Sequence, residues 1–129
     1  MRVLADVMTR RVFAVERGLG LREAARQMVE RGVGAAIVLD GERLVGILTE
    51  RDVLQAVASD RDRTSAVEDC MTAHPETVEP SETTDHAAAL MIHGGYRHLP
   101  VVDGARVVGI VSIRDLMRVT LDDTSPRGA

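Results

Sequence analysis

Residues 46–52 read Gly-Ile-Leu-Thr-Glu-Arg-Asp, and residues 109–115 read Gly-Ile-Val-Ser-Ile-Arg-Asp. Around these two stretches, residues 4–54 align with residues 67–117 without a gap. Identical residues fill about a third of the aligned positions, several times more than ordinary residue frequencies give by chance. Such self-similarity indicates one structural unit made twice.

Each copy predicts the same order of elements. A short strand comes first, and a segment with Ala, Ala and Met at helical spacing follows and stops at glycine. Two strands rich in β-branched residues then flank an Asp-Gly hairpin signal, and a closing helix starts at Thr49 or Ser112. The predicted segments before the closing helices are 12–15, 21–31, 35–39 and 44–48, and then 77–78, 84–93, 98–102 and 107–111.

The predicted fold class is therefore α/β (α+β), built from two β-α-β-β-α repeats. Residues 1–62 form the first repeat and residues 63–122 the second, with a polar linker at residues 59–65 and a disordered tail at 123–129. A repeat of this size buries too little surface to be stable alone. The two repeats are expected to pack about a pseudo-two-fold axis as one compact module.

Composition excludes several classes of function. The net charge of −4 argues against a nucleic-acid partner, and the absence of Lys excludes Schiff-base chemistry and a P-loop lysine. No apolar run reaches the ~20 residues of a membrane span, so a cytoplasmic protein is expected. Cys70 is the only cysteine, and the four histidines lack the spacing of a metal site. We therefore predict no metal, no catalytic residues and no enzymatic activity.

The repeated Gly-x-x-[Thr/Ser]-x-Arg-Asp motif carries the chemistry. It lies where a strand is predicted to end and a helix to begin, and the free N–H groups and helix dipole there favour an anion. The hydroxyl can bond a phosphate, the carboxylate a ribose, and the guanidinium a phosphate. The glycines inside the strands indicate that another group approaches the backbone closely. The candidate residues are Thr49, Arg51 and Asp52, and Ser112, Arg114 and Asp115.

A structural reading of the motif stays open beside this one. Thr-x-x-Asp and Ser-x-x-Asp are also ordinary capping boxes, in which the hydroxyl and the carboxylate satisfy backbone N–H groups of their own helix. Both readings can hold together, since a capping carboxylate can also face a cleft.

Three segments resemble paired CBS domains, the Bateman module: the Asp-x-Met-Thr opening, the Leu-Pro-Val-Val-Asp strand at 99–103, and the closing Gly-Ile-[Leu/Val]-[Thr/Ser]-x-x-Asp. The resemblance covers about residues 4–121. It implies tandem CBS repeats that usually form a homodimer, with AMP, ADP, ATP, S-adenosylmethionine or a relative in clefts between the repeats. It also implies that the Thr/Ser and Asp positions bind phosphate or ribose.

The resemblance further implies two unequal clefts, because the closing motif of one repeat faces the central strand of the other. The more basic cleft would combine Thr49, Arg51, Asp52, Arg97, His98 and Pro100. The first repeat has Ile37 where the second has Pro100, so its rim is less defined. The expected consequence is that Asp52→Ala weakens nucleotide binding more than Asp115→Ala does.

The predicted function is a regulatory module that senses an adenosine-type nucleotide and passes the state to a partner, such as a regulated enzyme or transporter. The alternative is a structural or protein-interaction dimer without a bound nucleotide. An unchanged melting temperature across adenine nucleotides would favour the alternative, because a ligand of the folded state must stabilise it.

Overall fold

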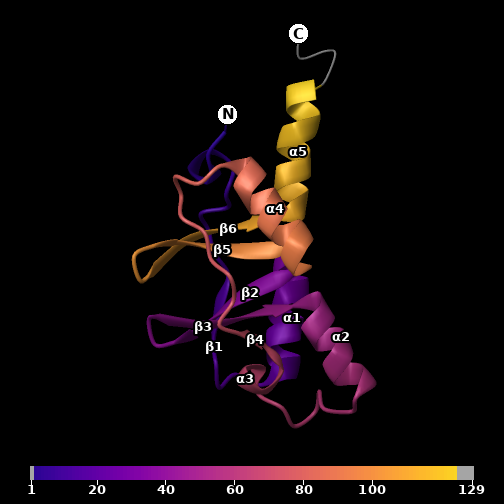
Figure 1. The fold of residues 1–129 in the computed structure, drawn as a ribbon. Helices are drawn as coiled ribbons and strands as arrows, with labels where there is room; N and C mark the ends of the chain where they lie inside the picture. Colours follow the sequence, from indigo (N-terminus) through magenta and orange to yellow (C-terminus); the bar gives the residue numbers. More distant parts are fainter. Residues whose placement is uncertain (1, 125–129) are drawn as a thin grey trace. The chain divides into compact units, whose positions relative to one another are not determined.

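The computed structural model describes residues 2–124, which form two compact units (Figure 1). The 12–75 unit spans Val12–Pro75, and the 76–129 unit combines Met1–Arg11 with Glu76–Ala129. Each unit thus holds one copy of the repeat from its first strand onward, together with the opening segment of the other copy. The opening segment is residues 67–75 in the 12–75 unit and residues 1–11 in the 76–129 unit. The mixture of helices and two sheets confirms the predicted fold class.

A four-stranded sheet lies at the centre of the 12–75 unit. The elements of this unit are β1 (Ala14–Glu16), α1 (Leu21–Arg31), β2 (Ala35–Asp40), β3 (Arg43–Thr49), α2 (Glu50–Ala58), α3 (Val67–Cys70) and β4 (Thr72–Ala73). The strand order is β1-β2-β3-β4, with β1 parallel to β2 and the other pairs antiparallel. Residues 35–38 are buried, as an apolar run in the middle of a sheet should be.

The apolar stripe of α1 covers this sheet. Leu21, Ala24 and Met28 recur at helical spacing and are buried in one cluster with Val38 and Leu48 of the strands. The observed bounds of α1 are those that the sequence predicts. The core of the 12–75 unit therefore follows from the periodicity of its own residues.

The 76–129 unit repeats the pattern. Its elements are the short 3-10 helix η1 (Leu4–Asp6), α4 (Thr84–Gly94), β5 (His98–Asp103), β6 (Arg106–Ser112) and α5 (Ile113–Thr124). Leu4 of η1 is buried with Met91, Leu99 and Val111, so the N-terminal segment completes this core. Figure 1 shows α4 beside α5, and their residues are in contact.

The two units differ at the first strand of each repeat, which is β1 in the 12–75 unit and the segment around Val78 in the other. In the 12–75 unit, the Ile37 N–H donates to the Phe13 carbonyl at 2.9 Å, just before β1 begins. The equivalent residue of β5 is Pro100, which has no N–H to donate. Around Val78 the described residues form a single parallel bridge, to Val101, in place of a named strand. One proline therefore shortens the counterpart of β1.

Each opening segment packs on a strand glycine of its own unit. A Cβ placed on Gly46 would overlap the Met71 sulfur and lie 2.9 Å from the Thr72 carbonyl oxygen. A Cβ on Gly109 would lie 2.7 Å from the Met8 sulfur. The predicted close approach at both glycines is confirmed, and the approaching group is a methionine side chain.

The predicted polar linker is tied to the 12–75 unit. The Arg22 guanidinium donates to the Asp62 carboxylate at 2.9 Å, and Arg61 donates to the Asp69 carbonyl at 3.2 Å. The hydrogen bond from Arg22 is the main reason that the pKa of Asp62 lies below its usual range.

At the C-terminal end, α5 continues to Thr124, past the predicted start of the tail at residue 123. The remaining tail residues, 125–129, lie outside the described residues. Among the helices of residues 2–124, none is long and apolar enough to cross a membrane. The repeat boundary at residues 62 and 63 stays a prediction.

Candidate functional site

Two strand-to-helix corners carry the repeated motif: the Thr49 corner (residues 49–52) and the Ser112 corner (residues 112–115). Thr49 ends β3 with extended backbone, at φ −117° and ψ 167°, and α2 begins at the next residue. Ser112 likewise ends β6 immediately before α5. Both corners therefore present the first N–H groups of a helix, which have no partner within the helix.

Both corners are reciprocal capping boxes. The Thr49 N–H donates to Asp52 Oδ2 at 2.9 Å, and the Asp52 N–H donates to Thr49 Oγ1 at 3.3 Å. The Ser112 N–H donates to Asp115 Oδ2 at 2.8 Å, and the Asp115 N–H donates to Ser112 Oγ at 3.1 Å. The capping interpretation is therefore confirmed at both places.

Capping uses only one oxygen of each carboxylate. Within residues 2–124, Asp52 Oδ1 accepts no hydrogen bond, and Asp115 Oδ1 has a guanidinium nitrogen of Arg118 at 3.9 Å. Both aspartates are partly buried, and Arg51 and Arg114 beside them are exposed. Each corner thus keeps an anionic oxygen and a nearby cation for a further partner.

Arg97 and His98 lie beside the Ser112 corner. The Ile113 N–H donates to the Arg97 carbonyl at 2.8 Å, and His98 pairs with Ser112 in the β5–β6 register. The sequence predicts these two residues beside the Thr49 corner, which belongs to the 12–75 unit. That combination stays a prediction. The proximity to Ser112 was visible in the sequence, because the hairpin around Asp103-Gly104 folds His98 back onto Ser112.

Pro100 is placed differently from the other predicted ligand residues. It lies inside β5 opposite Ile110, and its side chain is fully buried. Its carbonyl accepts from the Val78 N–H at 3.1 Å. Its observed contacts are those of a core residue, and a direct role toward a ligand stays a prediction.

Sequence reasoning missed Glu50 at the Thr49 corner. Its N–H donates to the Gly34 carbonyl at 3.1 Å, and its side chain lies over the same glycine, where a Cβ would overlap the carboxylate. A signal for Glu50 was present in the alignment of the two repeats. Gly34 aligns with Arg97, and Glu50 aligns with Ile113, so both positions change their charge between the repeats.

Among the histidines, His86 has an acidic neighbour. His86 Nε2 lies 2.9 Å from Glu82 Oε1, one helical turn before it on the chain. In the part of the chain that the structure describes, no three His, Cys, Asp or Glu side chains gather as metal ligands.

Solved structures similar to this chain are CBS-domain proteins. One from Burkholderia ambifaria is 36% identical with a TM-score of 0.91, and the match covers 96% of this chain and 97% of that one. The CBS domain pair of MJ0100, in complex with 5′-methylthioadenosine and S-adenosylmethionine, is 27% identical with a TM-score of 0.90, over 96% and 99% of the chains. The protein PAE2072 of Pyrobaculum aerophilum, complexed with AMP, is 28% identical with a TM-score of 0.82, over 88% and 89%.

The chain also has relatives in sequence. A 17.7 kDa protein from the bps2 3′ region of Acidianus ambivalens is 43% identical over 122 residues, which cover 92% of this chain and 73% of the relative. Two relatives are named as enzymes, a homoserine O-acetyltransferase and an L-aspartate semialdehyde sulfurtransferase, but this chain matches only 24% and 23% of their lengths. The profile of the CBS domain matches residues 4–59 and 67–122. The chain therefore belongs to the CBS domain family, as a tandem pair of such domains.

Proposed function

We propose that this chain is a regulatory module that binds an adenosine-type nucleotide at its strand-to-helix corners and passes the occupied state to a partner protein. The observation that supports this most is the duplicated corner. In each corner the aspartate caps the helix with one carboxylate oxygen, its other oxygen is not used for capping, and an exposed arginine lies beside it. The similar CBS pairs solved with AMP, or with S-adenosylmethionine and 5′-methylthioadenosine, hold ligands of the same class.

Each group at a corner has a distinct part in this proposal. The remaining carboxylate oxygen of Asp52 or Asp115 would accept hydrogen bonds from ribose hydroxyls. The hydroxyl of Thr49 or Ser112 and the N–H of Arg51 or Arg114 would contact a phosphate or ribose oxygen, since the neighbouring N–H groups of each first turn already have partners. Arg51 at the Thr49 corner, and Arg97 and Arg114 at the Ser112 corner, would add positive charge near the ligand, and His98 would add an imidazole that can form a hydrogen bond. No step of bond making or breaking is required, so the proposed activity is binding alone.

A thermal-shift screen of the full chain tests the proposal. We expect AMP, ADP, ATP or S-adenosylmethionine to raise the melting temperature, while guanine nucleotides leave it unchanged, because only a ligand of the folded state stabilises it. An unchanged melting temperature with every adenosine compound would contradict the proposal. The alternative, a structural or interaction module without a nucleotide, would then be favoured, since both aspartates already have a capping role.

Calorimetric titration of variants assigns the corners. Asp52→Ala and Asp115→Ala each remove a cap, so Thr83→Ala is the matched control: the Thr83 hydroxyl caps another helix, α4, by accepting from the His86 N–H at 3.1 Å. We expect the control to bind the ligand like the wild type. The variant at an occupied corner should lose about 10-fold or more in affinity, because hydrogen bonds to a charged group contribute ~1.5–3 kcal/mol.

We also propose that the module acts as a homodimer. Large apolar side chains are exposed at equivalent places of the two units, on α1 and α2 of one and on α4 and α5 of the other. A second copy of the chain offers a matching set, which favours a symmetric, self-complementary interface. A change in the shape of the dimer on ligand binding would be the signal that a regulated enzyme or transporter detects. The cytoplasmic location stays a prediction from the sequence.

A further inference from the structure

We infer that the two corners select ligands by charge, and that the residue pairs 34/50 and 97/113 determine this selection. The Ser112 corner takes an adenosine compound that carries phosphate, whereas the Thr49 corner rejects phosphate and takes an adenosine compound without it. This inference rests on the proposed function, because it assigns ligand classes to the same two corners.

The four residues occupy equivalent places in the two units. In the 12–75 unit the Glu50 N–H donates to the Gly34 carbonyl at 3.1 Å, and in the 76–129 unit the Ile113 N–H donates to the Arg97 carbonyl at 2.8 Å. Each bond joins the first residue of a helix, α2 or α5, to the residue just before a strand, β2 or β5 respectively. The side chains of residues 34 and 50 therefore stand at the same places in their unit as those of residues 97 and 113 in the other.

At the Thr49 corner the pair supplies a negative charge. A Cβ on Gly34 would overlap Glu50 Oε1 and lie 3.3 Å from Cδ, so the carboxylate lies directly over this glycine. Glu50 forms no ion pair with another residue between 2 and 124. The corner therefore carries the carboxylates of Glu50 and Asp52 against the one guanidinium of Arg51. A phosphate brought to the start of α2 would meet an unneutralised carboxylate.

At the Ser112 corner the same pair supplies a positive charge. Ile113 replaces the glutamate, and Arg97, at the place of the glycine, is exposed and forms no ion pair with the described residues. Arg114 is also exposed, so two guanidiniums stand against the single carboxylate of Asp115. Guanidinium groups bind phosphate oxygens in a forked geometry. This assignment reverses the ranking that the sequence predicts: for a phosphorylated ligand, Asp115→Ala should weaken binding more than Asp52→Ala.

Titration of the full chain with AMP and with adenosine tests the inference. Glu50→Gln removes the charge and keeps the shape of the side chain. We expect it to strengthen AMP binding at the Thr49 corner about 5- to 10-fold, the effect of a unit charge at about 4 Å screened as in bulk water, and to change adenosine binding less than about 2-fold. Ile113→Glu should weaken AMP binding at the Ser112 corner about 10-fold, again with little effect on adenosine.

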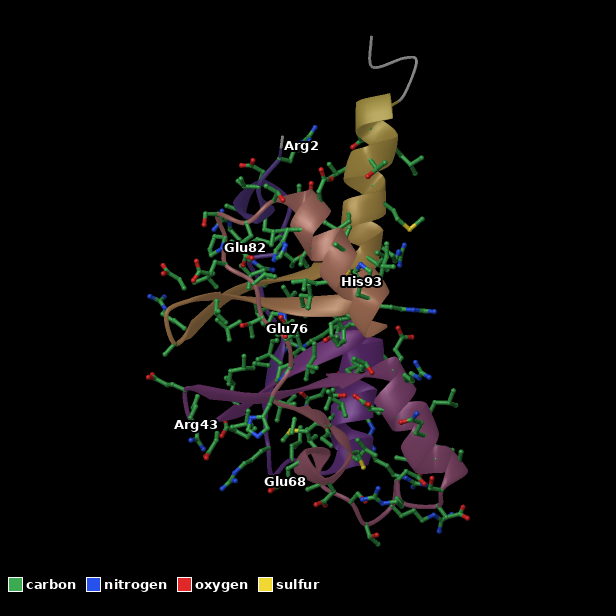
Figure 2. All side chains as sticks on the ribbon, in the orientation of Figure 1. Arg2, Arg43, Glu68, Glu76, Glu82 and His93 are labelled. Atoms are coloured by element: carbon green, nitrogen blue, oxygen red, sulfur yellow. The ribbon has the colours of Figure 1, made fainter. Side chains whose placement is uncertain are left out.

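Glu68→Gln is the matched control, because Glu68 is an exposed glutamate in the first turn of another helix of the same unit, α3 (Figure 2). It should leave both titrations as in the wild type. If AMP and adenosine bind and neither Glu50→Gln nor Ile113→Glu changes their ratio of affinities, the charge selection is wrong while the proposed function stands. If neither the wild type nor any variant binds either compound, and ADP, ATP and S-adenosylmethionine also leave the melting temperature unchanged, the proposed function itself is wrong.

Discussion

At the scale of single residues, the C-terminal ends of the helices use left-handed backbone, and one of them does so without glycine. Gly32 and Gly95 close α1 and α4 with left-handed backbone, at φ 65° and 76°. Asp60 takes the same conformation after α2, at φ 60°, and the Arg61 N–H donates back to the Ala56 carbonyl at 2.8 Å. This bond closes the helix as the Val33 N–H does for α1. Asp60 therefore stands where glycine is preferred.

We predict that Asp60→Gly stabilises the protein by about 1 kcal/mol, because glycine adopts the left-handed conformation without the steric cost of a side chain. The change also removes a carboxylate from the negative end of the α2 dipole. Chemical denaturation measures the free energy of unfolding. Gly32→Ala is the converse control and should lose about 1 kcal/mol, since the described residues leave its new methyl group open space and only the backbone strain counts. A less stable Asp60→Gly protein would contradict this explanation.

At the scale of elements, the contact between a strand glycine and the opening segment fixes where that segment docks. The new methyl group of Gly46→Ala would overlap the Met71 sulfur and press on the Thr72 carbonyl oxygen. We therefore predict a loss of about 1–3 kcal/mol in unfolding free energy, the usual cost of overpacking. Adding Met71→Ala should recover only part of this loss, because the carbonyl contact at 2.9 Å remains.

Gly18→Ala is the control for this prediction, since a methyl group there meets no described residue within 4 Å and the backbone is not left-handed. Its effect should stay within about 0.5 kcal/mol. Equal unfolding free energies for Gly46→Ala and Gly18→Ala would show that the opening segment moves aside without cost.

The elements also show which parts of the fold and site were predictable. The helix at residues 21–31 and the hairpins at Asp40-Gly41 and Asp103-Gly104 were predicted correctly, because their signals are local. The two capping boxes were predicted as one of two readings for the same reason. The pairing of β4 with β3 depends on residues far apart in the chain, so no local pattern reveals it. The position of the Glu50 carboxylate over Gly34 is a side-chain contact, which likewise required the structure.

At the scale of the whole molecule, the chain is a duplication that has exchanged its opening segments. Residues 1–11 belong to the unit that contains the second repeat, and residues 67–75 to the unit that contains the first. A cut between the two sequence repeats would therefore leave each with Gly46 or Gly109 uncovered by its methionine. This arrangement links the two sequence repeats by more than the linker.

The proposed homodimer gives the last prediction. Leu54 and Met117 occupy equivalent positions on α2 and α5, with exposed fractions of 69% and 57%, and Val29 and Ile92 do so on α1 and α4, with 81% and 74%. Because both units leave the same positions uncovered, a second copy can cover the two faces with like residues. We expect light scattering to show a dimer at micromolar concentration. Leu54→Glu and Met117→Glu should each shift the protein toward the monomer, because each variant buries an unpaired charge in the interface. Ala105→Glu, at the exposed β5–β6 turn, should leave the dimer intact. A wild-type protein that stays monomeric would require another occupant for these faces and another route for the ligand signal.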